Sequence, residues 1–310
     1  MPQWDFLNFL ADHARRFSHF TLLTQAEVTG LLYERNRVAG VSATAPDGPI
    51  EVGAKLTVGA DGRHSDVRRL AGLAPMNIGA PIDVLWFRVG RDTAAPFEQT
   101  LGRVQQGRLI VTLDRGEYWQ CAYVIPKGGA EAVRSRGLDA FRADVTQTVP
   151  ALRAHIDDVT SWDDVKLLTV TVDRLDRWSV PGLLCIGDAA HAMSPVGGVG
   201  INLAVQDGVA AANLLAAKLR EGEPSADDLD AVRRRRLLPA KIIQALQVTI
   251  QNRLLARSIG GGDMRRTFAV MRLFGRLSWL HGLPARLLGF GPRPEHVRTR
   301  EEPPLSAASI

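Results

Sequence analysis

The spacing of apolar residues changes several times along the chain, and each change predicts a different kind of element. In the segment Trp4–Phe17 apolar residues recur every three or four positions, which places them on one face of a helix. From residue 21 to residue 44 the pattern is that of β-strands, broken at Glu34–Arg37 by a predicted hairpin turn. A second turn is predicted at 46–49, where Pro-Asp-Gly-Pro interrupts the pattern.

The middle of the chain, from about residue 82 to residue 172, is dominated by strand patterns. Its apolar runs are IDVLWFRV, RLIVTL, YWQCAYVIP and KLLTVTV. One helical stretch, Leu138–Val149, interrupts them and is expected to stop at Pro150, because proline cannot continue a helix. This block predicts an antiparallel sheet that is half-exposed on one face.

Helical patterns dominate the last third of the chain. A short apolar strand at 182–186 leads into a glycine-rich string and then into a long alanine-rich helix, Leu203–Leu219. Beyond Gly222 apolar residues recur at helical spacing, and three glycines at 260–262 form a hinge before a last amphipathic helix. The polar, proline-rich tail at 296–310 is expected to be disordered.

Length and composition describe an ordinary globular chain. Its 310 residues, of which 45% are apolar and 23% charged, are enough for two domains. The formal charge of +5 is carried by arginine-rich helical runs such as Arg233–Arg236, which are typical of a solvated helix face. No basic strand with interleaved aromatic residues is present, so we expect no nucleic-acid partner.

Several classes of site and location are disfavoured by the residues themselves. The two cysteines, Cys121 and Cys185, lie in apolar runs, which excludes a disulfide framework and argues against a metal cluster. No metal-ligand spacing, Ser-His-Asp set or pair of carboxylates emerges, so no residue is assigned a catalytic role and no metal is expected. The start of the chain lacks the pattern of a signal peptide, and no stretch reaches the roughly 18 apolar residues that span a bilayer. We therefore expect a cytoplasmic chain without a transmembrane segment.

The densest chemical pattern is the string CIGDAAHAMSPVGGVGIN at 185–202. An apolar strand ends in Gly187-Asp188, and a glycine-rich loop then opens the next helix. A carboxylate just past a strand end can accept hydrogen bonds from two hydroxyls of a ribityl or ribose chain. Glycines at 197, 198 and 200 let the backbone approach a flat ligand, and the free N–H groups of the helix start favour an anion. A tight strand–turn–helix corner would also use these glycines, but the string as a whole favours a cofactor site.

A second pattern, VGADGRHSDVR at 58–68, is again a strand, an Asp-Gly turn and a short helix. Ser65 is the predicted N-cap of that helix. By itself an Asp-Gly pair after a strand marks a turn as readily as a ligand site. The interpretation of this string as a ligand site therefore depends on its order relative to the string at 185–202.

In this order the two strings resemble those of the flavoprotein aromatic hydroxylases related to p-hydroxybenzoate hydroxylase. In that family the first string helps to hold FAD and NAD(P)H, and the Asp of the second binds the flavin ribityl chain. The proline and the glycine-rich helix start of the second string lie against the isoalloxazine ring. The resemblance implies cofactor-binding roles for Asp61, Gly62, Arg68, Gly187, Asp188, Pro195, Gly197, Gly198, Val199, Gly200, Ile201 and Asn202.

The resemblance also implies an α/β fold, in which a Rossmann-like FAD-binding domain carries an inserted antiparallel β-sheet substrate domain and C-terminal helices. It assigns 1–80 and 176–222 to the FAD-binding domain, 81–175 to the substrate domain and 223–295 to a helical region. Members of the family begin with a strand and a GxGxxG turn, and nothing before Asp61 has that form. We therefore expect the natural chain to start upstream of Met1, a real truncation being the alternative.

Aromatic and basic residues on the central strands are the candidate substrate contacts. They are Trp86, Arg88, Trp119 and Tyr123, which either face a substrate above the flavin or belong to the core. His191, in the cofactor turn, is expected to support the loop by hydrogen bonds rather than to act in catalysis. The last amphipathic helix is expected to dock on the body of the protein or on a second subunit of a homodimer, in preference to a membrane surface.

The activity that the resemblance implies is monooxygenation of a small aromatic or polyketide-like molecule. NAD(P)H would reduce the FAD, O₂ would add at the flavin C4a, and the resulting hydroperoxide would transfer oxygen to the ring. Two alternatives stay open. One is an FAD oxidoreductase of the same fold that inserts no oxygen, and the other is a non-catalytic fragment that cannot hold FAD.

Overall fold

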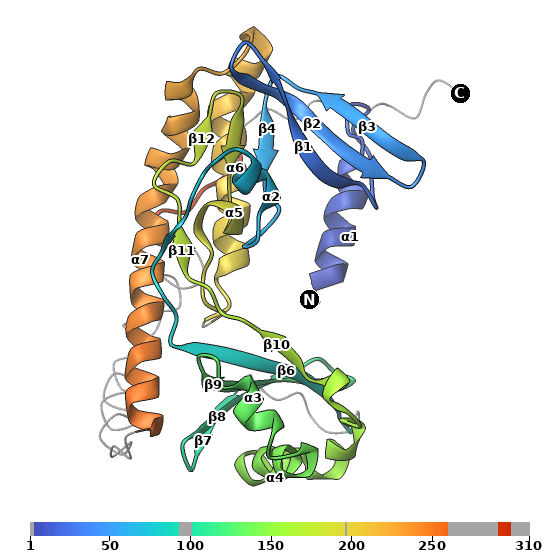
Figure 1. Cartoon of the computed structure of the whole chain (residues 1–310), viewed down its shortest axis with the longest axis vertical. Coiled ribbons are helices and arrows are strands. Elements are labelled where there is room, and N and C mark those ends of the chain that lie inside the picture. The colour runs from blue at the N-terminus through green and yellow to red at the C-terminus, as the bar shows by residue number, and fades with distance from the viewer. Residues whose placement is uncertain (1–2, 93–100, 196, 260–290, 299–310) are drawn as a thin grey trace.

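The computed structural model describes residues 3–92, 101–195, 197–259 and 291–298. Figure 1 shows an upper part made of helices and small sheets and a lower part built on a five-stranded sheet. The glycine hinge at 260–262, the last amphipathic helix and the tail from residue 299 lie outside the described residues. No helix within the described ranges is both long enough and apolar enough to cross a membrane.

The chain opens with a helix and an antiparallel hairpin, as the apolar spacing predicts. Helix α1 (Gln3–Ala14) is followed by β1 (Glu27–Glu34), β2 (Arg37–Ala45) and β3 (Gly48–Gly53), which pair in the order β1-β2-β3. The loop between β1 and β2 is Arg35-Asn36, with φ angles of 47° and 65°. Positive φ at both loop residues is what a type I′ turn requires, so the hairpin turn predicted at 34–37 is confirmed.

Two short strands from distant parts of the sequence form a parallel pair in the upper part. They are β4 (Thr57–Gly59) and β13 (Leu183–Cys185), and β12 (Ser179–Val180) pairs with the other edge of β13. The three residues of β13 are fully buried, which explains why the sequence reads as a continuous apolar run. Both strands were predicted, and each lies within a residue of its predicted position.

The helices that follow these two strands complete the upper part. Helix α2 (Asp66–Leu70) follows β4, and α5 (Asp188–His191) and α6 (Gly200–Glu221) follow β13. The long helix α7 (Ala226–Ile259) packs along α6 and continues past it toward the level of the lower part (Figure 1). Segment 291–298 returns to α6, where the Asn213 side chain bonds the backbone of His296 and Arg298. The predicted disordered tail therefore does not begin at 296.

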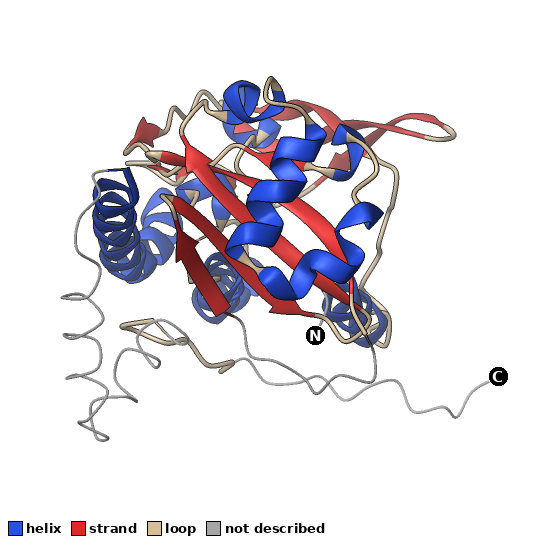
Figure 2. Ribbon diagram, turned by 90° about the horizontal axis from the view of Figure 1, so that it is seen from below, coloured by secondary structure: helices blue, strands red, loops and turns tan. Residues whose placement is uncertain are grey.

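The lower part is an antiparallel sheet with the order β10-β6-β9-β8-β7. Its strands are β6 (Ile82–Gly90), β7 (Leu101–Gln105), β8 (Arg108–Asp114), β9 (Tyr118–Pro126) and β10 (Lys166–Leu168). Figure 2 shows helices lying across one face of this sheet. The covering helices are α3 (Ala130–Arg134), α4 (Leu138–Thr148) and the 3₁₀ helices η1 (Pro150–Asp158) and η2 (Trp162–Asp164).

One prediction for this part was wrong in extent, and one element was missed. The helical stretch ends before Pro150, as predicted: α4 ends at Thr148, and Val149 has non-helical φ and ψ angles of −129° and 82°. A separate 3₁₀ helix, η1, then begins at Pro150, in whose first turn a missing N–H costs nothing. The strand predicted over KLLTVTV ends at Leu168, and Asp173–Arg174 then forms β11, which pairs with β5 (Met76–Asn77) in a separate ribbon. That ribbon lies where the chain passes from the lower part back to the upper one.

Candidate cofactor site

The two predicted strings meet at one edge of the parallel pair. Because β4 and β13 run in the same direction with Gly59 opposite Cys185, the turns after both strands lie side by side. The backbone N–H of Ile186 donates to the carbonyl of Gly59 at 2.9 Å, which continues the pairing to the start of the second turn. Chain segments far apart in sequence are therefore brought to one place by strand pairing alone.

The first turn is organised by the carboxylate of Asp61. It accepts hydrogen bonds from the Ser65 hydroxyl and from the backbone N–H of Val67 at 3.0 Å. Ser65 in turn caps α2 by accepting from the N–H of Arg68, as predicted. Gly62, with a φ of 87°, supplies the left-handed backbone that lets the chain reverse. Asp61 thus shapes the turn, and its side chain is already bonded within the protein.

Arg68 joins the first turn to the second. Its guanidinium is buried and donates to the carbonyls of Ala189 at 3.2 Å and Arg63 at 2.9 Å. It also lies 3.6 Å from the Asp173 carboxylate. The family resemblance implied contact with the cofactor, whereas the structure gives this side chain protein partners on each side. Arg68 is therefore a residue that fixes the distance between the two turns.

Asp188 occupies the position expected of a polyol acceptor. It begins α5 directly after Gly187, whose φ of 58° and 3.0 Å approach to Ala204 leave no room for a side chain. The Asp188 side chain is 32% exposed and lies 3.6 Å from the Arg63 guanidinium. Burial raises the pKa of Asp188, and the nearby Arg63 charge partly opposes that rise. The carboxylate is therefore held at the surface of the turn with room for a ligand.

The glycine-rich loop presents backbone rather than side chains. Gly197 and Gly198 are exposed and have φ angles of 83° and 63°, and Gly200 begins α6. The N-cap residue of α6, Val199, makes no side-chain capping bond, and the positive dipole end of the helix lies at this loop. Ile201 and Asn202 are exposed beside them, whereas Val199 is buried against Leu203 and packs the loop onto the core. Pro195, which precedes this stretch, is partly buried.

A buried ionic network, which the sequence did not reveal, fixes the second turn from behind. His191 Nε2 lies 2.5 Å from Asp207 on α6, and that carboxylate also accepts from the Gly187 N–H at 3.0 Å and from Arg236 Nε at 2.9 Å. Burial alone would raise the pKa of Asp207, but the His191 and Arg236 charges and hydrogen bonds lower it. His191 therefore supports the loop, as expected, and Asp207 and Arg236 are the residues that hold it. The sequence signal that could have identified this network is Asp207, an acidic residue in the middle of the alanine-rich helix.

Three buried glutamines of α7 hold the next part of the loop. Gln244 donates to the carbonyls of Ala192 and Asp173, Gln247 donates to the carbonyl of Ser194, and Gln251 bonds the Ser194 hydroxyl. Their spacing of three and four residues puts them on one face of α7. We call these three residues the glutamine ladder. They replace water around a loop whose own backbone groups would otherwise be unpaired.

The four candidate substrate residues divide between the two faces of the lower sheet. Trp86 and Arg88 lie on the face without helices, and Arg88 pairs across the strands with Gln120. Trp119 and Tyr123 point to the opposite face, where both are buried in the apolar core and the Tyr123 ring lies 5.7 Å from that of Phe141 on α4. The substrate assignment of Trp119 and Tyr123 does not fit the structure, because side chains of odd and even positions on a strand point to opposite faces.

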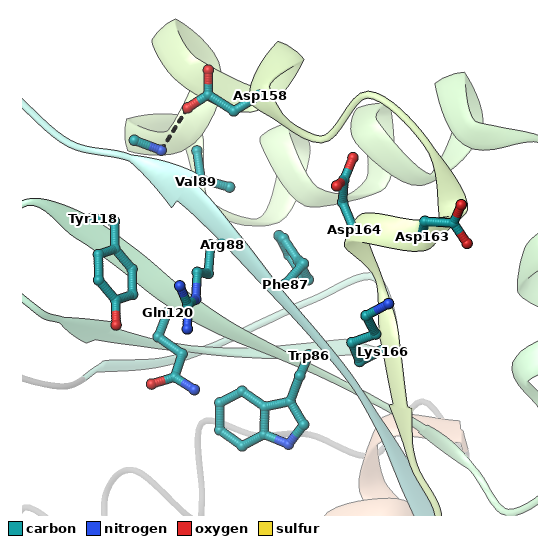
Figure 3. A pocket seen from close by; sticks show the side chains of 11 residues that line it. Trp86, Phe87, Arg88, Val89, Tyr118, Gln120, Asp158, Asp163, Asp164 and Lys166 are labelled. Atoms are coloured by element: carbon teal, nitrogen blue, oxygen red, sulfur yellow. Dashed lines mark hydrogen bonds between the residues drawn. The ribbon is translucent and has the colours of Figure 1, made fainter. Parts of the chain in front are cut away.

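A pocket of about 680 Å³ opens beside Trp86 and Arg88. Figure 3 shows the side chains of Trp86, Arg88, Tyr118 and Gln120 pointing to one side of the sheet. The Arg88 guanidinium lies over the Tyr118 ring at 4.9 Å, and Lys166 adds a second cation at the rim. Of the acids nearby, Asp158 accepts from the Gly90 N–H and Asp164 caps η2. The pocket therefore combines flat aromatic surfaces with cationic groups.

The residues of the two turns fit the flavin end of an FAD molecule. Asp188 offers acceptor oxygens for a polyol, and an added Cβ at Gly198 would meet no atom of the described residues within 4 Å. The positive dipole end of α6 suits the electron-rich edge of a flat ring.

Comparison with known proteins agrees with this site. The family model described as "FAD binding domain" matches residues 1–245. A 6-methylpretetramide 4-monooxygenase from Streptomyces rimosus is 35% identical over 259 residues, which are 82% of this chain and 61% of that protein. The ubiquinone hydroxylase UbiL of Rhodospirillum rubrum is 30% identical over 299 residues, 89% of this chain and 64% of that protein. The chain thus spans less than two thirds of the length of either relative.

A solved structure shows the same fold. The p-nitrophenol 4-monooxygenase PnpA from Pseudomonas putida DLL-E4 superposes with a TM-score of 0.71 at 19% identity, covering 93% of this chain and 72% of that one. The antiparallel sheet and the surrounding α/β elements therefore share the fold of that protein. With the family match over most of its length, this chain belongs to the FAD-dependent aromatic hydroxylase family.

Proposed function

We propose that this chain forms the flavin-ring and substrate-binding parts of an FAD-dependent monooxygenase, which uses NAD(P)H and O₂ to hydroxylate an aromatic or polyketide-like small molecule. The observation that carries the proposal is the meeting of Asp188 with the glycine-rich start of α6 at the end of one parallel pair. Figure 1 shows the loop between α5 and α6 at the end of the upper part nearest the five-stranded sheet. A monooxygenase relative named for a polycyclic substrate supports this substrate class.

The cofactor-binding roles follow the chemistry of each group. Asp188 would accept hydrogen bonds from ribityl hydroxyls, and Gly197–Asn202 would lie against the ring. The dipole of α6 would stabilise negative charge on the ring edge nearest its N-terminus. Bound FAD would supply the redox and oxygen-transfer chemistry, while the protein orients the ring and excludes water. Residues 1–80 and 176–222 are the proposed cofactor part, and 81–175 the proposed substrate part.

The substrate would occupy the pocket on the open face of the lower sheet. Trp86 and Tyr118 offer aromatic faces on which a planar ring can stack, since offset aromatic pairs are favourable. Arg88 and Lys166 would bind a phenolate, enolate or carboxylate oxygen of the same molecule. The two features together favour a flat substrate that carries at least one acidic oxygen.

Flavin binding is tested first, by fluorescence titration of the chain with riboflavin and with FAD. Residues 1–60 contain no GxGxxG turn, so for this chain of 310 residues we expect the two dissociation constants to agree within about tenfold. Asp188→Ala should weaken both, and Asp163→Ala, at the distant pocket rim, should change neither. Stoichiometric FAD retained through gel filtration would contradict the expected weak binding. Absence of any riboflavin binding would support the non-catalytic alternative.

The reaction class is tested with isotopic oxygen. The FAD-loaded chain, given NADPH or NADH and a panel of phenolic substrates under ¹⁸O₂, should yield product that carries one labelled oxygen. Arg88→Ala should lower turnover without lowering flavin affinity, because Arg88 lies on the lower sheet and not in the two turns. Substrate-dependent NAD(P)H oxidation that incorporates no label would instead identify an oxidoreductase without oxygen insertion.

A further inference from the structure

We propose that Arg63 is a positioning residue of the flavin site, which holds the Asp188 carboxylate in place and in its charged form. This inference rests on the proposed function of Asp188. Arg63 follows the first turn directly and reaches across to the second, where its Nη2 lies 3.6 Å from Asp188 Oδ2. It was not among the residues that the family resemblance assigned to the cofactor.

The Arg63 side chain is held in this position from two sides. Its backbone carbonyl accepts a hydrogen bond from the buried Arg68 guanidinium at 2.9 Å, and its own Nη1 reaches the carbonyl of Thr169 at 3.5 Å. The side chain is 24% exposed, so its charge is only partly screened by water. Arg63 therefore joins the first turn, the segment after β10 that returns from the lower sheet, and the second turn.

The other charged groups that act on Asp188 have partners of their own and act on it less than Arg63 does. His191, on α5, lies 2.5 Å from Asp207. Asp173, on β11, lies 3.6 Å from the buried Arg68. Among the charged side chains of the described residues, Arg63 is the one paired with Asp188 itself. The ionisation of Asp188 thus depends chiefly on the balance between its burial and the Arg63 charge.

This balance matters because the two forms of a carboxyl bind a polyol differently. An ionised carboxylate accepts hydrogen bonds on both oxygens, and charge-assisted bonds are about twice as strong as neutral ones. A protonated carboxyl loses that advantage and turns one oxygen into a donor. Without Arg63, the half-buried Asp188 would take up a proton closer to neutral pH, and flavin affinity would become dependent on pH.

The ligand-free chain provides the first test. The pKa of Asp188 is measured by carboxyl ¹³C NMR, with its resonance assigned by its loss in Asp188→Asn. Arg63→Met should raise that pKa by about one unit, since an opposite charge at this range shifts a carboxyl by one to three units. Arg63→Lys should restore most of the shift. Arg69→Met, which removes an exposed arginine paired with Asp66 on the same short helix, should have no effect. An unchanged Asp188 pKa in Arg63→Met overturns the proposal.

The second test is riboflavin affinity from pH 5.5 to 8.5. Arg63→Met should weaken binding by about tenfold near pH 5.5 and much less at pH 8.5, whereas the parent and Arg69→Met should vary little. If Asp188→Ala weakens binding and Arg63→Met does not at any pH, the role of Arg63 is wrong and the flavin assignment stands. If Asp188→Ala binds like the parent, the proposed function fails instead. If the chain binds no riboflavin, the NMR titration alone decides.

Discussion

At the scale of single residues, Asp188 combines a proposed ligand-binding role with a cost to the stability of the ligand-free fold. Burial raises its pKa, so the folded chain binds this proton more tightly than the unfolded chain. Its contribution to stability is therefore greatest at low pH and is lost as the pH rises through the unfolded and then the folded pKa. Residues kept for function often show this kind of trade-off.

Asp188→Asn should consequently raise the thermal stability of the ligand-free chain at pH 7 by a small amount, below about 1 kcal/mol because the group is partly exposed. The same change should weaken flavin binding by roughly ten- to a hundredfold, as charge-assisted bonds are lost. Melting curves and flavin titrations measure the two effects separately. A variant that melts lower and binds flavin as before would contradict both parts.

Asp207 presents the opposite case. Its pKa is lowered by the His191 and Arg236 partners despite complete burial, so its contribution to stability is present above the unfolded pKa and is lost as the pH falls through the folded one. Asp207→Asn should cost about 3–5 kcal/mol at pH 7, because it removes the nearer of the two carboxylates that pair with the buried Arg236, the other being Glu295 at 3.8 Å. It should also flatten the acid limb of the stability profile.

Urea unfolding at several pH values measures this effect. Asp12→Asn, which breaks the exposed pair with Arg15, is the matched control and should change stability by about 0–1 kcal/mol. Equal losses in the two variants would show that the buried network does not hold the turn.

At the scale of elements, the packing of the lower sheet against α4 is centred on one side chain. Phe141 is fully buried and contacts the rings of Phe87, Tyr123 and Trp162. Phe141→Ala should therefore cost about 3–5 kcal/mol of unfolding free energy, whereas Arg88→Ala on the open face should cost far less. Chemical denaturation followed by tryptophan fluorescence compares them. Similar losses of unfolding free energy in the two variants would contradict the assignment of one face to the core and the other to the open side of the sheet.

An element could be predicted from the sequence when the residues that specify it lie within it or next to it. The hairpin at 34–37, the strands at both turns and the helix after Gly200 carry their own turn or capping residues, and all were found. The face on which Trp119 and Tyr123 lie could not be predicted. Alternation along a strand shows which side chains share a face, but it does not show which of the two faces the helices cover. The helices at 150–164 were missed because Pro150 was taken as an end when it is also a favoured start.

The same distinction holds within the cofactor site. Asp188 and the glycines were assigned to the cofactor because their order in the chain resembles that of a family, and this assignment stays a prediction. Asp207, Arg236 and the glutamine ladder were missed because they act only after α6 and α7 pack behind the loop. The partner of a single polar residue in a helix cannot be predicted from the local pattern, because the partner lies far away in the sequence.

At the scale of the whole molecule, apolar surface gathers near the amino terminus. Trp4 is 75% exposed, and Leu7, Phe9 and Leu10 on the same helix are 42%, 51% and 44% exposed. The described part of the chain also exposes Phe20 and Leu23 in the segment before β1. Apolar patches of this kind mark contact surfaces or sites of aggregation.

We therefore expect the chain to self-associate at micromolar concentration, and the double change Trp4→Lys, Phe9→Lys to reduce that association by at least about tenfold. Sedimentation velocity over a concentration series measures it. Leu167→Lys, which replaces an exposed apolar residue of the lower sheet, serves as control. A parent chain that sediments as a monomer at high concentration would argue against both the patch and the expected homodimer.

Helix α7 holds the cofactor loop at two levels. Arg236, in its first half, acts through Asp207 of α6, and the glutamine ladder further along bonds the loop directly. We therefore expect local unfolding of α7 to release the residues of the loop in a fixed order. Fraying of α7 from its C-terminal end would release Ser194 first and Ala192 next, while Asp207 still holds Gly187. In a holoenzyme the ring end of the flavin would thus gain freedom before the polyol end, and amide exchange in the loop would follow the exchange of the outer turns of α7.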